Sequence, residues 1–179
     1  MKYLIFILFT CSQLMSINCD ISPEGEKRLL NLPYEKFDQT FSEGWRKYAD
    51  RGCYQLSAEL LDKYFELHKD MFMPWQKQII TWHAGQMYAF DDNYEFARIR
   101  FNNSFDPDEG VQAKILWNDY VHATISFLNK DIKKLKFHRE KIASGPELDG
   151  KKPNLNVVDN LIKCFNKPYR VAYSGCNSE

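Results

Sequence analysis

The four histidines are the residues best suited to acid–base chemistry in this 179-residue chain. An imidazole can act as a general base beside a carboxylate, or it can bind a metal ion. The four are His68, His83, His122 and His138. No two of them have the His-x-x-x-His or His-Glu-x-x-His spacing that places two metal ligands on one helix face. The chain also lacks a nucleophile elbow, a P-loop and a dinucleotide fingerprint. We therefore predict no metal, no cofactor and no catalytic residue.

One pattern keeps an enzymatic alternative open. His122 shares a predicted helix with Asn118, Asp119 and Ser126, and a histidine beside a carboxylate can serve as a base. The alternative is a small hydrolase of the cell envelope that uses His83 or His122 with a nearby acid. A solvated polar helix face explains the same residues without catalysis. The two interpretations differ in whether His83 and His122 meet in one pocket.

The elements that position these residues are predicted to be helices. Apolar residues recur at helical spacing along most of the chain, and no stretch alternates with period two for long enough to favour a strand. Pro74 lies at a helix start, while Pro107 and Pro168 end two others. The predicted helices cover residues 34–48, 56–67, 74–87, 94–105, 116–127, 132–142 and 155–165. The predicted fold class is all-α.

These helices also repeat. Tyr48-Ala49, Tyr54 and Ser57 correspond to Tyr88-Ala89, Tyr94 and Ala97 at a shift of 40 residues, and a similar correspondence at a shift of 38 links the following segment. A period near 40 with two helices per unit is typical of α-solenoids. We predict a short right-handed solenoid of about three antiparallel helix hairpins with a C-terminal capping helix. The hairpins span 34–69, 75–105 and 111–143, and the capping helix spans 154–166.

One stretch resembles a known family. Over residues 78–109, the run Ala84-Gly85, Tyr88, Tyr94, Ala97, Phe101 and Pro107 resembles a tetratricopeptide repeat, in which small residues let two helices touch. Thr81 stands where a bulky apolar residue is usual, and Pro107 comes two residues early. The resemblance implies a right-handed stack whose first helices line a concave inner surface. It implies no catalytic activity.

By analogy with that family, an aromatic groove is expected on the inner surface. The groove residues are Ile79, Trp82, Gln86 and Phe90 from one unit and Trp117, Tyr120 and Thr124 from the next. Such a surface suits an apolar peptide or helix. The alternative is that Trp82 and Tyr120 are buried against neighbouring helices. We predict an exported, non-catalytic module that binds a protein or peptide partner in the cell envelope, with a self-associating structural subunit as a further alternative.

The first 19 residues read as an export signal. Lys2 precedes a wholly apolar run from Tyr3 to Phe9, which is too short for a permanent membrane anchor. The following Ser16-Ile17-Asn18-Cys19 resembles a bacterial lipoprotein cleavage site that would lipidate Cys19, although Asn18 departs from that pattern. An ordinary signal-peptidase cut is the competing interpretation. The protein is thus expected to be periplasmic, envelope-anchored or secreted. Residues 20–33 then form a leader, 34–166 the repeat domain and 167–179 a tail.

Charge excludes one class of partner. The chain has 24 basic and 24 acidic residues, and residues 1–19 contain only Lys2, which leaves a net charge of −1 beyond them. A nucleic-acid partner would require a positive excess. Lysines and an arginine gather in the predicted helix 132–142. Together with a lipid anchor, this helix could touch a membrane surface, or it could be a solvated face.

Three cysteines follow the predicted signal: Cys53, Cys164 and Cys176. In an exported protein an odd number allows at most one pair among them. A bridge between Cys164 and Cys176 would tie the tail to the last helix. Three unpaired thiols are the alternative.

Overall fold

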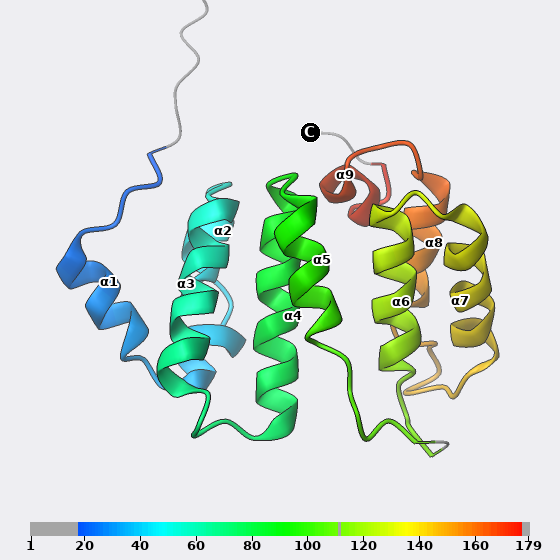
Figure 1. The fold of residues 1–179 in the computed structure, drawn as a ribbon, viewed down its shortest axis with the longest axis horizontal. Helices are drawn as coiled ribbons and strands as arrows, with labels where there is room; N and C mark the ends of the chain where they lie inside the picture. Colours follow the sequence, from blue (N-terminus) through cyan, green and yellow to red (C-terminus); the bar gives the residue numbers. More distant parts are fainter. Residues whose placement is uncertain (1–17, 111, 177–179) are drawn as a thin grey trace, which may run out of the picture.

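The computed structural model describes residues 18–110 and 112–176, and these residues form helices that pack side by side (Figure 1). The predicted all-α fold class is confirmed, because the described residues contain nine α-helices, one π-helical segment and no strand. Most of the predicted export signal, residues 1–17, lies outside the described residues. No helix in the described ranges combines the length and the apolar character needed to cross a membrane.

The N-terminal part differs from the single helix predicted over residues 34–48. It consists of α1 (Pro23–Leu30), a π-helical segment η1 (Glu35–Gln39) and the short α2 (Arg46–Ala49). Gly44 explains the break after η1. It has φ +52°, and a Cβ at this position would lie 1.9 Å from the carbonyl oxygen of Phe37. Only glycine tolerates both the conformation and the close approach, so the chain turns here instead of continuing as a helix.

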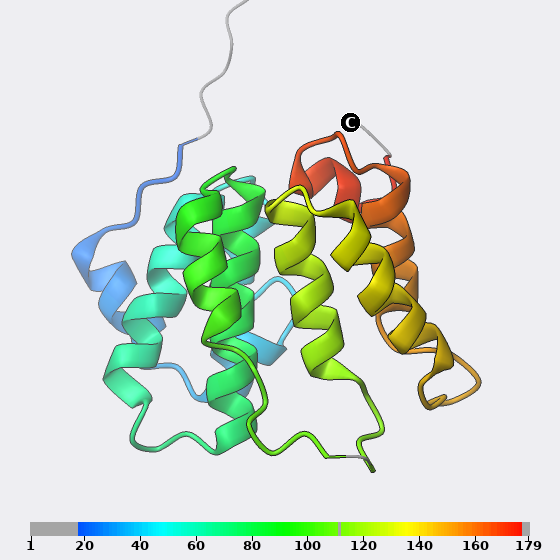
Figure 2. The same cartoon turned by 45° about the vertical axis from the view of Figure 1, so that its right-hand side comes forward.

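The central part consists of five long helices: α3 (Tyr54–His68), then a first hairpin of α4 (Pro74–Phe90) and α5 (Tyr94–Asn102), and then a second hairpin of α6 (Trp117–Leu128) and α7 (Ile132–Ser144). α3 packs on α4, which packs on α5, and Figures 1 and 2 show the second hairpin beside the first. Gly85 permits the closest contact between α4 and α5, because a Cβ there would lie 2.7 Å from Cδ1 of Phe101.

The C-terminal part contains one helix more than predicted. α8 (Leu155–Lys163) lies within the helix predicted over 154–166, and it packs on α7 and α6. The predicted tail, however, contains α9 (Tyr169–Tyr173), which packs on α8 and α4. Tyr169 and Ala172 of α9 are fully buried. One face of α9 is therefore part of the core.

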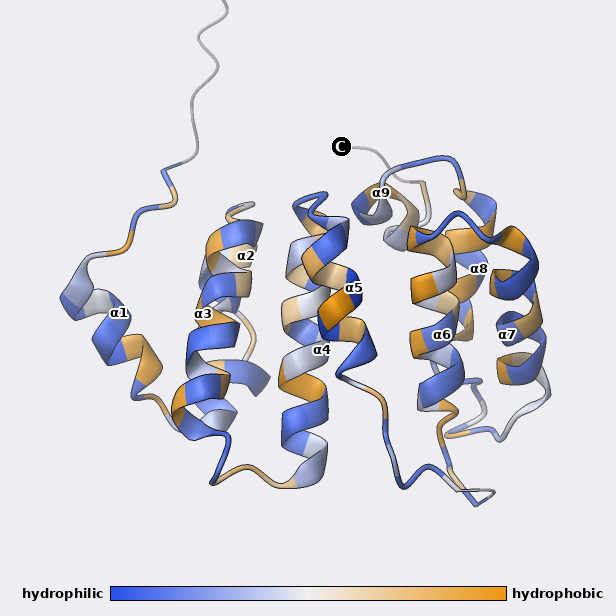
Figure 3. Cartoon of the chain, in the orientation of Figure 1, coloured by the Kyte–Doolittle hydropathy of each residue, from blue (hydrophilic) through white to orange (hydrophobic). Residues whose placement is uncertain are grey.

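A single apolar core extends from α1 to α9. Apolar and polar bands alternate along the helices, as Figure 3 shows for α5 and α6, and this is the pattern of helices that are half buried. Large side chains occupy the core in both the N-terminal and the C-terminal parts of the fold. The fully buried ones include Phe37, Trp45, Phe101, Phe127 and Tyr169. Burial of such rings is the main stabilising contribution to the fold.

Candidate functional site

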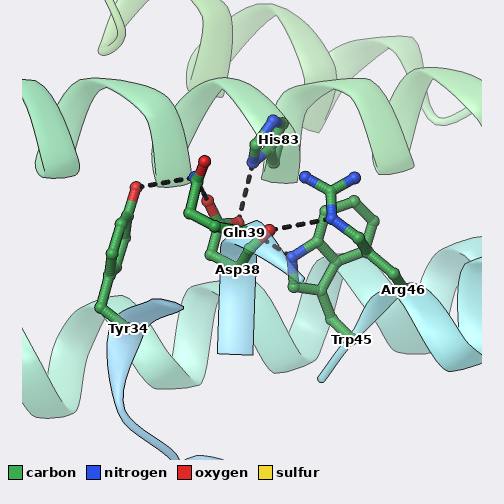
Figure 4. Close-up of polar contacts among 6 residues, drawn as sticks. All are labelled: Tyr34, Asp38, Gln39, Trp45, Arg46 and His83. Carbon is green, nitrogen blue, oxygen red and sulfur yellow. Dashed lines mark hydrogen bonds and ion pairs between the residues drawn. The ribbon is translucent and has the colours of Figure 1, made fainter. Parts of the chain in front are cut away.

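The carboxylate of Asp38 is fully buried and accepts three side-chain hydrogen bonds. Its Oδ1 accepts hydrogen bonds from Nε1 of Trp45 at 2.9 Å and from Nδ1 of His83 at 2.8 Å. Its Oδ2 accepts from Nε2 of Gln39 at 2.6 Å. Arg46 donates from Nε to the Asp38 carbonyl at 2.8 Å (Figure 4). These residues, with Tyr34 beside Gln39, are called the Asp38 cluster below.

The hydrogen bonds keep Asp38 ionised although it is buried. Burial by itself raises the pKa of a carboxyl group, because a low-dielectric environment disfavours charge. The bonds from His83 and Trp45 and the positive charge of Arg46 outweigh burial and hold the pKa of Asp38 below its ordinary value. The site therefore contains a fixed negative charge around which the two basic side chains are oriented.

Arg46 bonds to the Asp38 carbonyl and stacks on Trp45, but no hydrogen bond from the described residues engages the ends of its guanidinium group. Its guanidinium carbon lies 4.3 Å from the ring centroid of Trp45, a cation–π distance. Burial lowers the pKa of Arg46, and the neighbouring Asp38 and Asp50 partly offset this effect. Among the described residues, its terminal nitrogens Nη1 and Nη2 have no hydrogen-bond acceptor. Figure 4 shows these nitrogens on the same side of Asp38 as His83.

His83 completes the cluster from α4. Nδ1 bonds to Asp38, and Nε2 is the ring nitrogen without a hydrogen-bond partner among the described residues. The side chain is 16% exposed. A histidine oriented by a buried aspartate is two-thirds of a catalytic triad. The third member is missing, since in residues 18–110 and 112–176 no hydroxyl or thiol is hydrogen-bonded to His83. The cluster can therefore bind an acidic group through Arg46 and His83, or orient a water molecule.

The other histidine considered for catalysis lies elsewhere. His122 on α6 stacks on His138 of α7, with ring centroids 4.8 Å apart and planes at 15°. His138 bonds through Nδ1 to Asp119 at 2.7 Å. Burial and the charge of His138 lower the pKa of His122. His83 and His122 thus belong to two clusters on different helices, and they do not meet in one pocket.

The described residues contain no group of three or more His, Cys, Asp or Glu side chains that could hold a metal ion. The remaining histidine, His68, bonds through Nε2 to the carbonyl of Leu30 at 2.8 Å. It also packs against Tyr64, with ring centroids 4.3 Å apart. Its role is therefore to join α3 to the end of α1.

The predicted aromatic groove is not open at most of its residues. The structure buries Trp82, Gln86, Tyr120 and Thr124, and leaves Ile79, Phe90 and Trp117 partly exposed. The ring of Trp82 lies 4.7 Å from that of Tyr120 and 5.1 Å from that of Trp117. These large rings fill the space between α4 and α6. Four of the seven predicted groove residues are therefore buried, and for Trp82 and Tyr120 this is the alternative stated above. Binding of a partner at the remaining residues stays a prediction.

The C-terminal helix accounts for the rest of this burial. The ring of Phe90 lies 5.7 Å from Tyr169 and 5.4 Å from Tyr173, both on α9. Burial and Tyr173 raise the pKa of Tyr169 well above its ordinary value, and the facing side chains of Gln86 and Thr124 partly offset this. The chain's own α9 occupies part of the surface that was predicted for a partner. The spacing of Tyr169, Ala172 and Tyr173 after Pro168 is the sequence signal for this helix.

Four cysteines form two disulfides. One joins Cys164 to Cys176, with Cα atoms 5.7 Å apart, and fixes the segment that carries α9. The other joins Cys19 to Cys53, with Cα atoms 5.5 Å apart. A sulfur atom in a disulfide cannot also carry a lipid, so the bridge and the predicted lipidation of Cys19 are mutually exclusive.

The basic helix is partly neutralised within the fold. Arg139 donates from Nε to Asp159 at 2.8 Å, and Lys141 lies 3.5 Å from Asp119. Lys134 lies 3.7 Å from Asp131. Three of the basic side chains of helix 132–142 therefore have acidic neighbours, as expected for a solvated helix face.

No protein-family model, curated protein or solved structure matches this chain. Function therefore has to be inferred from the chemistry of the site, because a helical fold by itself is compatible with many functions.

Proposed function

We propose that this protein is an exported, non-catalytic helical module that binds a protein or peptide partner through an acidic group of that partner. The observation that carries the proposal is that Arg46 and His83 lie side by side at Asp38 with nitrogen atoms left for a ligand. Asp38 orients both side chains, while the terminal nitrogens of Arg46 have no acceptor in the described chain. The α4–α5 and α6–α7 hairpins would be tetratricopeptide-like units of a short right-handed solenoid, and the close approach at Gly85 supports this arrangement.

The chemistry of Arg46 favours a carboxylate. A guanidinium presents its nitrogens as a planar fork that matches two carboxylate oxygens. A partly buried cation without a direct ion pair is also electrostatically unfavourable, and an acidic ligand would compensate it. His83 would donate a second hydrogen bond from Nε2 when protonated. Asp38 would then balance the added positive charge.

Export is supported by the cysteines as well as by the apolar N-terminus. Disulfides persist in oxidising compartments and are rare in the cytosol. Since Cys19 pairs with Cys53, we place the signal cleavage before Cys19, so that the mature chain retains it. The product would be periplasmic or secreted. The lipid-anchored alternative requires a free Cys19 sulfur, and the intact mass of the non-reduced mature protein distinguishes the two.

The binding function can be tested with an unbiased peptide library in which half of the peptides have a free C-terminus and half an amidated one. We expect enrichment of peptides with Asp, Glu or a free C-terminal carboxylate. Arg46→Gln should weaken binding by about tenfold or more, which corresponds to 1.4 kcal/mol. The control Arg28→Gln, on the exposed face of α1, should leave affinity unchanged. Failure to enrich any peptide, or equal binding by Arg46→Gln, would reject the proposal.

A hydrolase remains the second candidate, because His83 and Asp38 have the geometry of a base and its orienting acid. The test is turnover on a panel of ester, amide, glycoside and phosphate substrates. Activity that is lost in His83→Ala and retained in His122→Ala would favour the enzyme. Equal rates in the wild type and in His83→Ala would exclude His83 as the base.

A self-associating subunit is the third alternative. The solution mass of the disulfide-intact protein tests it directly. A strict monomer over the accessible concentration range would argue against self-association.

A further inference from the structure

The Asp38 cluster lies at one end of a row of side chains on α4. Trp75, Ile79 and His83 are spaced four residues apart on this helix, and residues at this spacing form one row along a helix surface. With a rise of about 1.5 Å per residue, Ile79 lies about 6 Å and Trp75 about 12 Å from His83 along the helix axis. The row therefore leads from a basic group to two apolar groups.

The apolar end of this row is accessible and is held in place. Trp75 is 47% exposed, and its ring packs edge-on against Tyr34 with the centroids 5.6 Å apart. The Tyr34 hydroxyl accepts a hydrogen bond from Nε2 of Gln39 at 3.2 Å, and the same nitrogen bonds to Asp38. Figure 4 shows Tyr34 and Arg46 at opposite ends of this cluster. Because Trp75 is already positioned, a ligand that covers it loses little affinity to the ordering of the ring.

The exposed part of the row is narrow. Ile79 is partly exposed, whereas its neighbours Ile80 and Trp82 on α4 are buried. A partner helix is about 10–12 Å wide and makes contact through more than one row of side chains. An extended chain presents a single row, in which alternate side chains point to the same side at steps of about 7 Å. These steps match those of about 6 Å along α4, so an extended chain fits this surface better than a helix does.

Charge fixes the end of the row at which an acidic group binds. The terminal nitrogens of Arg46 and Nε2 of His83 have no hydrogen-bond acceptor within residues 18–110 and 112–176. Trp75 and Ile79, at the other end, offer mainly apolar atoms. A ligand that covers the whole row therefore needs a carboxylate at one end and apolar side chains at the other.

We propose, on the basis of the acid-binding function above, that the partner is an extended peptide segment with large apolar side chains two and four residues from its acidic residue. The carboxylate lies at Arg46 and His83, the nearer apolar side chain lies on Ile79, and the farther one lies on Trp75. Tryptophan and arginine are the residues that most often dominate the binding energy of an interface. Apolar side chains one and three residues from the acid would point away from the row.

Fluorescence anisotropy with labelled synthetic peptides tests this register on the disulfide-intact protein. The matched peptide has one Asp, Leu two and four residues from it, and Ser elsewhere. The shifted peptide has the same composition, with Leu one and three residues from the Asp. Both are made in the two chain directions with blocked ends, so that the Asp carries their only carboxylate. We expect the wild type to bind the matched peptide, in one direction, about tenfold more tightly than the shifted one.

Trp75→Ser separates the apolar contact from the acidic one. It should weaken binding of the matched peptide by about tenfold and leave binding of the shifted peptide unchanged, whereas Arg46→Gln should weaken both. Phe96→Ser on α5 is the matched control, because Phe96 is an aromatic residue with 45% exposure, and it should bind as the wild type does. Circular dichroism establishes that each variant is folded.

The outcomes separate this register from the acid-binding function. Equal binding of the matched and shifted peptides, or unchanged binding by Trp75→Ser, would overturn the register, and weaker binding by Arg46→Gln in the same experiment would retain the acidic contact. Tighter binding of a peptide with Leu four and eight residues from the Asp, the helical equivalent, would also overturn it. No binding of any peptide, or equal binding by Arg46→Gln, would reject the acid-binding function and the register together.

Discussion

Removal of the Asp38 carboxylate should destabilise the fold more than any other single change in the site. Asp38→Ala leaves three side-chain donors, on Trp45, His83 and Gln39, without their acceptor. Hydrogen bonds to a charged group contribute about 1.5–3 kcal/mol each, but neighbouring losses are not additive. Breaking a buried ionic network costs about 3–5 kcal/mol. We therefore expect Asp38→Ala to lower the free energy of unfolding by about 3–5 kcal/mol at neutral pH.

Asp38→Asn separates the charge from the hydrogen bonds. The amide oxygen can still accept from Trp45 and His83, so we expect a loss of about 1–2 kcal/mol, mainly from lost charge assistance. The pKa of Asp38 is lower in the folded protein than in the unfolded chain. The ionised carboxylate therefore contributes stability above about pH 4, and this contribution is lost as the pH falls through the folded-state pKa. The difference between wild type and Asp38→Asn should shrink in acid.

Urea unfolding followed by circular dichroism at pH 7 and near pH 3 measures both effects. Asp70→Asn is a matched control, because Asp70 is exposed at the end of α3, and it should change stability by less than about 0.5 kcal/mol. The reasoning is refuted if Asp38→Ala costs less than about 1 kcal/mol. It is also refuted if wild type and Asp38→Asn lose stability equally on acidification.

Three further predictions concern other parts of the chain. Replacing Cys19 and Cys53 together by serine should lower the free energy of unfolding by about 3–4 kcal/mol. Free thiols at both positions in the native protein, detected by mass spectrometry, would contradict the bridge. Gly85→Ala should lower the free energy of unfolding by about 1–2 kcal/mol in urea, although alanine has the better helix propensity, because the new methyl group meets the buried ring of Phe101. An unchanged or higher stability would count against this packing. Because the pKa of His122 is lowered in the folded protein, the unfolded chain binds more protons below about pH 6.5, and the wild type should lose stability as the pH falls. His122→Gln should lose less stability, as measured by thermal unfolding. An identical loss would show that this residue is not responsible.

The long helices could be predicted from local sequence. Pro74 marks the first residue of α4, and Pro107 follows the end of α5. The apolar spacing of α6 and α7 predicted both helices. The small residue Gly85 indicated a close helix contact, and the structure places Phe101 against it. These features depend on neighbours within a few turns, which is the range that periodicity and helix-end residues report.

The Asp38 cluster could not be predicted in the same way. Asp38 and His83 are 45 residues apart, and no spacing rule joins a π-helical turn to the middle of α4. Apolar periodicity also predicted a continuous helix where Gly44 turns the chain. The burial of four predicted groove residues has a related cause. Periodicity identifies an apolar face, but it does not say which segment covers it, and here α6 and α9 both pack against α4.

The sequence by itself therefore determined the helical class, the approximate positions of the long helices and the residue types that could bind or react. Only the tertiary structure decided which of those residues meet. It joined His83 to Asp38, separated it from His122, buried Trp82 and Tyr120, and paired Cys19 with Cys53. The physical reason is that helix formation depends on interactions within a few residues, whereas these contacts depend on how whole helices pack around one core.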